Sequence, residues 1–155
     1  MYEHFFHHTL DIARNQYDCI ALNEFITDAD DHFYRNLLLG VVERNTLFLS
    51  NDPSGNFVVQ HVLKLHDLRC TFNVAAGLRG HCIDLSFKKY ESYIVEKLLE
   101  VEESMAVPVL EFLECDGDRL MRLARNEFGN FVVFKAMKVT QEMSREINTI
   151  CPFLS

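Results

Sequence analysis

Four segments of the chain carry two polar or variable side chains four residues apart, with a flat or apolar side chain directly after the first. Residues i and i+4 lie side by side on one face of a helix, so each set would form a small composite site. We call each set a triplet. The triplets are Cys19, Ile20 and Asn23; Asn56, Phe57 and Gln60; Ser92, Tyr93 and Glu96; and Asn130, Phe131 and Phe134.

The side chains of the triplets suit the edges and faces of nucleic-acid bases. Asn56 and Gln60 offer donors and acceptors that can meet the edge of uracil. The carboxylate of Glu96, beside Ser92, can accept from the two adjacent N–H groups of guanine. On a single helix the aromatic second members would more often be packing residues, but their recurrence beside polar pairs favours stacking on bases. The triplets therefore predict that the chain reads single-stranded RNA one base per repeat.

The triplets recur at a regular spacing, which indicates an internal repeat. Their first members are 37, 36 and 38 residues apart. At three further positions, each at a fixed distance from the first member of the triplet, the residue is apolar in all four copies. We call each set of equivalent residues a column. The columns are Ile12, Leu49, Leu85 and Leu123; Leu22, Val59, Val95 and Val133; and Ile26, Leu63, Leu99 and Met137.

The apolar spacing within each copy is typical of helices that bury one face. Over Pro53–Leu65 the spacing predicts a helix with Asp52 as its N-cap, and another helix is expected over Phe33–Leu49. Pro108 is expected to kink or interrupt its helix. We therefore predict an all-α fold, an α-solenoid of about four three-helix repeats forming one domain over 1–155. The approximate repeats are 1–32, 33–68, 69–106 and 107–145, with a tail over 146–155.

The segments Asn56–Leu63 and Ser92–Leu99 resemble the recognition helices of Pumilio (PUF) repeats. The stretches before them, Asp52–Gly55 and Leu85–Tyr90, are similar to that family as well. The resemblance extends over nearly the whole chain, roughly from Phe5 to Met143. It implies a cytoplasmic protein that binds single-stranded mRNA sequence-specifically in 3′ untranslated regions and controls translation and message stability.

The resemblance also implies a role for each triplet. The second triplet matches the uracil type, the third matches the guanine type, and the fourth matches the uracil type except at Phe134. The first triplet departs from the common pairs. A 5′-GU-3′ preference within a UGU-type core follows, because RNA runs antiparallel to the protein in this family. The family usually has eight repeats, and this chain resembles the C-terminal half. The RNA-binding candidates are Cys19, Asn23, Asn56, Phe57, Gln60, Ser92, Tyr93, Glu96, Asn130 and Phe131.

Composition and charge narrow the classes of function. Apolar residues make up 48% of the chain and charged residues 25%, which is a normal balance for a globular protein. Because the net charge is −8, we expect any RNA-binding site to be a local patch of the surface. No apolar run is long enough to cross a membrane, and five cysteines without a CxxC pair favour a reducing compartment. We expect a monomer without catalytic residues, metal or cofactor.

A second reading keeps the fold and changes the function. The acidic balance, Phe134 and Ile20 at triplet positions, and the short array suit a degenerate α-solenoid. Such a protein would be an interaction scaffold that binds protein effectors and has no useful RNA affinity.

Overall fold

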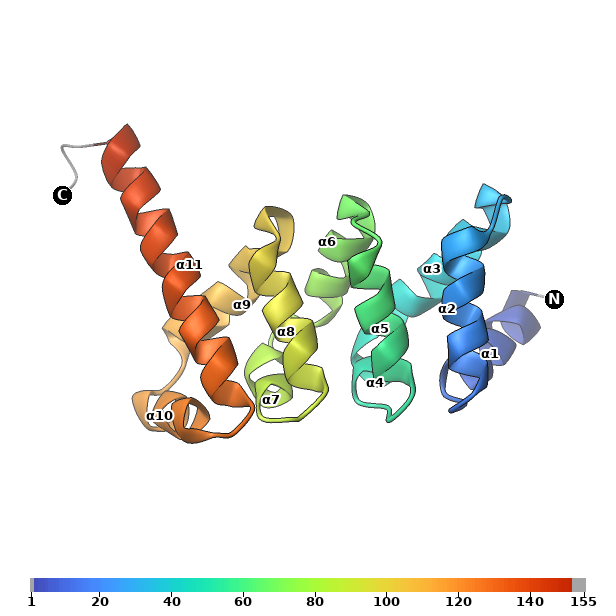
Figure 1. The fold of residues 1–155 in the computed structure, drawn as a ribbon, viewed down its shortest axis with the longest axis horizontal. Coiled ribbons are helices and arrows are strands. Elements are labelled where there is room, and N and C mark those ends of the chain that lie inside the picture. Colours follow the sequence, from blue (N-terminus) through green and yellow to red (C-terminus); the bar gives the residue numbers. More distant parts are fainter. Residues whose placement is uncertain (1, 152–155) are drawn as a thin grey trace. The chain divides into compact units, whose positions relative to one another are not determined.

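The computed structural model describes residues 2–151, and this part of the chain folds into eleven helices without a strand (Figure 1). Position 1 and positions 152–155 of the expected tail lie outside the described residues. The all-α prediction is confirmed, and no helix among the described residues could span a membrane. The helices are α1 Tyr2–Ala13, α2 Asp18–Asp28, α3 His32–Arg44, α4 Thr46–Ser50, α5 Gly55–Lys64, α6 Leu68–Gly77, α7 Cys82–Ser86, α8 Glu91–Glu100, α9 Glu102–Glu114, α10 Gly117–Arg125 and α11 Gly129–Ile150.

The chain forms two compact units, Met1–His81 and Cys82–Ser155. In the first unit α2 packs against α5, while α3 packs against α6. In the second unit α8 packs against α9 and α11, and α10 packs against α11. Each unit thus places two triplet-bearing helices side by side. The single array over 1–155, with its four repeat boundaries, stays a prediction.

The apolar columns supply much of the core. Leu49, Leu85 and Leu123 are almost completely buried, as are Val59 and Val95. The last column ends differently, since its final member, Met137, is 67% exposed. The pattern of apolar residues therefore gives the buried face of nearly every copy.

Two local expectations differ from the structure. The predicted helix over Phe33–Leu49 is divided into α3 and α4 at Asn45, where φ is −120° and ψ is 25°. The side-chain amide Nδ2 of Asn45 donates to the backbone carbonyl of Val41 at 2.8 Å, and this local bond competes with the backbone hydrogen bonds of the helix. Conversely, α9 continues through the buried Pro108, which removes only one backbone donor from a well-packed helix.

Candidate nucleic-acid interface

Short side-chain turns set the start of three triplet helices. Before α5, the carboxylate of Asp52 accepts from the backbone N–H groups of Ser54 and Gly55, at 3.0 and 2.8 Å. Asn126 caps the turn before α11 through its amide oxygen, and Asn15 does the same before α2. The helix predicted from Pro53 begins two residues later, at Gly55, because Asp52 caps a turn that precedes it. These turns fix where the triplets of α2, α5 and α11 begin.

Asp52 is held as a carboxylate by its contacts. Burial opposes its ionisation, but the bonds from Gly55 and Ser54 and the Arg14 guanidinium outweigh that effect and lower the pKa of Asp52. Arg14 reaches Asp52 from the end of α1, with Nε 3.0 Å from Oδ1. The turn before α5 is therefore tied to the preceding repeat.

The first member of every triplet bonds to the backbone of its own turn. Each side chain donates to the carbonyl three residues earlier: Cys19 to Gln16, Asn56 to Pro53, Ser92 to Lys89 and Asn130 to Glu127. Both asparagines also donate to the carbonyl four residues earlier. These bonds explain why polar side chains can be buried at the start of the helices.

The second members of the triplets all face solvent. Ile20 is 58% exposed, Phe57 43%, Tyr93 49% and Phe131 61%. At this level of exposure, part of each aromatic ring is open to solvent and can stack on a base. The structure thus presents three aromatic rings and one aliphatic side chain at equivalent positions.

The third members are partly buried in three triplets and exposed in the fourth. Asn23, Gln60 and Glu96 are of intermediate exposure, whereas Phe134 is 70% exposed. The amide of Gln60 donates to Oδ1 of Asn56 at 3.1 Å, which links the third member to the first. In α2 the buried Oδ1 of Asn23 accepts no hydrogen bond from any residue in 2–151.

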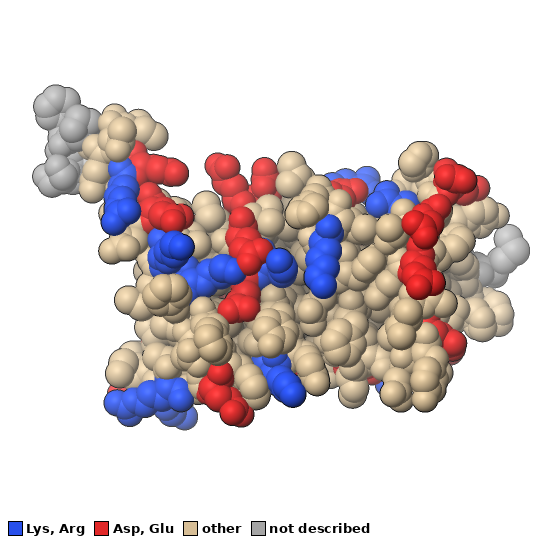
Figure 2. Space-filling view, in the orientation of Figure 1, with Lys and Arg blue, Asp and Glu red and all other residues tan. Residues whose placement is uncertain are grey.

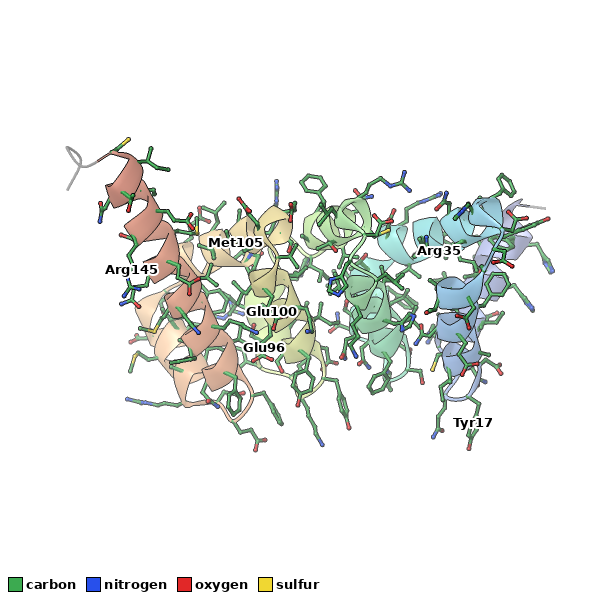
Figure 3. All side chains as sticks on the ribbon, turned by 45° about the horizontal axis from the view of Figure 1, so that its top comes forward. Tyr17, Arg35, Glu96, Glu100, Met105 and Arg145 are labelled. Carbon is green, nitrogen blue, oxygen red and sulfur yellow. The ribbon has the colours of Figure 1, made fainter. Side chains whose placement is uncertain are left out.

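Charges gather around the third triplet in the second unit. Glu96 and Glu100 lie one turn apart on α8 (Figure 3), and Lys97 and Lys135 both form ion pairs with Glu100. Burial raises the pKa of Glu96, and nearby Lys135 only partly offsets this. For Glu100, burial is outweighed by the two lysines, so its pKa is lowered. Figure 2 shows side chains of both signs meeting over α8 and α11.

One residue at the interface of α2 and α5 has a partner that the sequence does not reveal. Nε2 of His61 lies 2.7 Å from the hydroxyl of Thr27, which itself donates to the carbonyl of Asn23. Burial lowers the pKa of His61, so the neutral imidazole is favoured in this contact. Since His61 directly follows Gln60, this contact joins the second triplet to the first. In the sequence, the one indication of this contact is the position directly after the triplet, which holds His61, Lys97 and Lys135 in three of the copies.

The structure brings the predicted residues together in pairs of triplets. In the first unit, the first two triplets lie on α2 and α5, which pack against each other. In the second unit, the last two triplets lie on α8 and α11, which also pack against each other. No group of three or more His, Cys, Asp or Glu side chains in the described part of the chain could hold a metal ion. The arrangement offers rings, amides and one carboxylate, which suit binding better than covalent chemistry.

Curated proteins from Arabidopsis thaliana are similar to almost the whole chain. Pumilio homolog 18 is 68% identical over 145 residues, which is 94% of this chain and 44% of that protein. Another pumilio homolog of the same organism is 66% identical over 147 residues, with 95% and 45% covered. The chain thus spans less than half the length of these relatives. No protein-family model matches it.

Solved structures share the fold. The Puf4 RNA-binding domain bound to an HO endonuclease RNA 3′ UTR recognition sequence matches with a TM-score of 0.78 at 22% identity, over 99% of this chain and 50% of that one. PUF-8 in complex with PBE-RNA matches with a TM-score of 0.73 at 17% identity, over 94% and 44%. The predicted α-solenoid of helical repeats is thereby confirmed.

Proposed function

Because the chain belongs to the Pumilio repeat family, we propose that it binds single-stranded RNA and distinguishes bases through its triplets. The observation that carries this proposal is the set of exposed second members, three of them aromatic, each beside a partly buried polar side chain or Phe134. Stacking on such rings contributes about 1–3 kcal/mol per base. The RNA that relatives of known structure hold is consistent with this class of ligand.

The proposed target is a UGU-type element in a 3′ untranslated region. In the third triplet Tyr93 stacks on guanine, and the carboxylate of Glu96 accepts from its two N–H groups. In the second triplet Phe57 stacks on uracil while Gln60 meets its edge. Phe131 stacks on the preceding uracil, without a polar third member. Binding of this kind in the cytoplasm would control translation and stability of the message.

Fluorescence anisotropy with short labelled RNAs tests the proposal. A UGU-containing oligomer is expected to bind at least tenfold more tightly than an ACA oligomer, a difference of about 1.4 kcal/mol. Equal binding of the two RNAs would remove the claim of base reading, and binding of neither would remove the claim of RNA binding.

Glu96→Gln tests the guanine assignment. The variant loses preference for UGU over UAU, because the amide presents a donor to one guanine N–H group. Glu103→Gln, on the exposed side of α9, removes the same charge and should keep the preference. Since the pKa of Glu96 is raised, the preference is present above that pKa and is lost as the pH falls through it. A guanine preference that survives in Glu96→Gln would overturn the assignment.

The protein-interaction scaffold is a second candidate, favoured by a specific observation. Lys97 and Lys135, the cations beside the third triplet, are both paired with Glu100, and Phe134 offers no polar group to a base. If neither RNA binds in the anisotropy experiment, this candidate is the one that remains.

A further inference from the structure

The fourth triplet, on α11, has no polar third member. The other three triplets hold an amide or a carboxylate at that position, on Asn23, Gln60 or Glu96. The fourth holds Phe134, whose ring offers neither an N–H or O–H donor nor an oxygen or nitrogen acceptor to the edge of a base. Its first two members are the same residue types as in the second triplet, so these two triplets differ at the third position only.

The first member of the fourth triplet, Asn130, does not replace the missing polar group. Its Nδ2 donates to the carbonyls of Asn126 and Glu127, at 2.9 and 3.0 Å, so its two N–H groups are directed into the turn. What Asn130 can offer to a base is therefore its Oδ1, which is an acceptor. Every base has at least one N–H group that a single acceptor can meet, so this oxygen does not distinguish one base from another.

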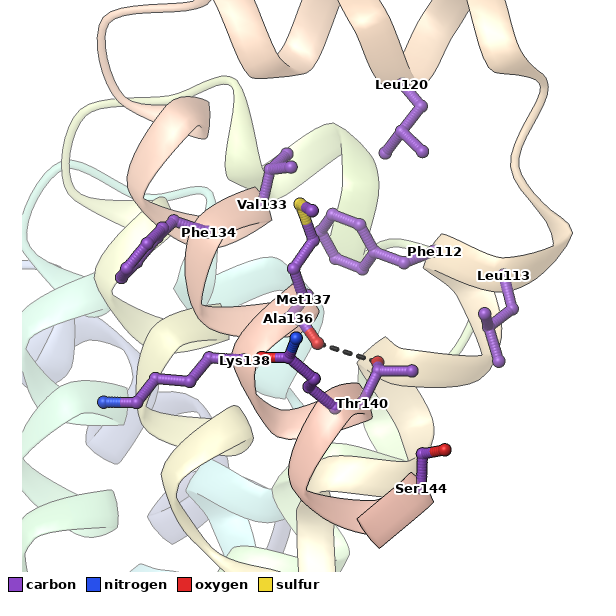
Figure 4. A pocket seen from close by; sticks show the side chains of 11 residues that line it. Phe112, Leu113, Leu120, Val133, Phe134, Ala136, Met137, Lys138, Thr140 and Ser144 are labelled. Atoms are coloured by element: carbon purple, nitrogen blue, oxygen red, sulfur yellow. Dashed lines mark hydrogen bonds between the residues drawn. The ribbon is translucent and has the colours of Figure 1, made fainter. Parts of the chain in front are cut away.

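The two rings of the fourth triplet are presented together on α11. Phe131 and Phe134 are both more than 60% exposed, and positions three apart are neighbours on the surface of a helix. In Figure 4 the ring of Phe134 points away from Phe112 and Leu120, which lie on the other side of α11. Rings of this kind bind a base by its face, and every base has such a face.

We propose that the fourth triplet binds its base by stacking alone and accepts all four bases. This inference rests on the proposed function, because it concerns the base that precedes the guanine bound by the third triplet. The guanine and the uracil after it then determine which RNA is bound, and UGU is one member of a 5′-NGU-3′ class. Purines bind at this position at least as tightly as uracil, because their larger rings stack over a larger area.

The physical reason is that a mismatch carries no penalty at Phe134. In the second triplet, a base that does not match the amide of Gln60 leaves a partly buried polar group without a partner, which weakens binding. Phe134 has no polar group that could be left unpaired. Because both rings of the fourth triplet are largely exposed, the edge of the stacked base stays in contact with water, whichever base it is.

Fluorescence anisotropy with four RNAs that differ only in the base before GU tests the proposal. The wild-type chain is expected to bind UGU, AGU, CGU and GGU with affinities within about threefold of one another. Binding of UGU that is tighter than that of AGU and CGU by about tenfold or more would overturn the inference and leave the proposed function intact.

A fifth RNA, UAU, separates the two claims. It should bind more weakly than UGU, because the third triplet still selects guanine. Binding of none of the RNAs would overturn the proposed function and this inference together. Equal binding of UAU and UGU would do the same, because the fourth triplet would then not differ from the third.

Phe134→Gln gives the fourth triplet the residue types of the second. The variant is expected to acquire a preference of about fivefold or more for UGU over AGU and CGU. Met137→Gln introduces the same side chain at an exposed position of α11 outside the triplet, and should bind the four RNAs as the wild type does. Circular dichroism verifies that both variants remain helical. Equal binding of the four RNAs by Phe134→Gln would show that the third position does not meet the base, and would overturn the inference.

Discussion

Within a triplet, the three side chains have different tasks. The first member is bonded to the backbone of its own turn in all four copies, while the second faces solvent. The third is partly buried beside the first, as Gln60 is beside Asn56. Folding therefore depends most on the first member, and the proposed RNA contacts depend most on the other two.

Asn56→Ala should lower the free energy of unfolding by about 1–3 kcal/mol, because the buried Asn56 side chain no longer donates to the carbonyls of Asp52 and Pro53 or accepts from the Gln60 amide. Urea denaturation followed by circular dichroism measures the change. Phe57→Ala, one residue along and exposed, should alter stability by less than about 0.5 kcal/mol while weakening UGU binding. If Asn56→Ala were as stable as the wild type, the side-chain bonds to the turn would have no energetic role.

At the scale of the helices, a close approach to the core requires glycine at the first residue of α5 and of α11, whereas α2 and α8 begin with Asp18 and Glu91. A Cβ placed on Gly55 would lie 2.9 Å from both the carbonyl oxygen and Cδ2 of buried Leu49. At Gly129 the corresponding contact, with Leu123 Cδ1, would be only 2.2 Å. Glycine is needed at these starts for space rather than for an unusual backbone angle.

Gly55→Ala should therefore destabilise the chain by about 1–3 kcal/mol, since a backbone carbonyl cannot move aside as a flexible side chain can. Gly117→Ala is the matched control, because a Cβ there meets nothing within 4 Å at the start of α10. Its stability should stay within about 0.5 kcal/mol of the wild type. Thermal unfolding of both variants measures the difference, and equal losses would contradict the steric argument.

The sequence predicted the helices and their buried faces well, because an apolar column such as Leu85 and Leu123 reflects burial directly. It did not predict the division at Asn45 or the continuous helix through Pro108, which depend on local bonds and packing with no periodic signal. The residues of the candidate site were identified from their repetition. The bonds of Ser92 and Asn130 to their own turns were not, although serine and asparagine near a helix start commonly make them.

For the molecule as a whole, the balance of charge affects how it would hold RNA. The net charge is −8, and the cations beside the third triplet are paired with Glu100. Affinity would come mainly from stacking and base-edge contacts, with few phosphate contacts. The slope of log K against log salt concentration is then shallow, with a magnitude below about 2.

Glu100→Gln tests this balance. The variant frees Lys97 and Lys135, so RNA affinity should rise and the salt slope should steepen by about 1. Glu103→Gln, with the same loss of charge on α9, should leave the slope unchanged. Anisotropy titrations at several salt concentrations give both slopes. An unchanged slope in Glu100→Gln would mean that these lysines do not approach the phosphates.

The bond from each first member to its turn has a consequence for changing the proposed choice of RNA sequence. Substitutions at Asn56 or Ser92 would remove bonds to the turn and so weaken the fold, which limits the variety tolerated there. Gln60 and Glu96 contribute less to the stability of the fold. Retargeting by laboratory design, or divergence between gene copies, would therefore proceed more readily through the third position.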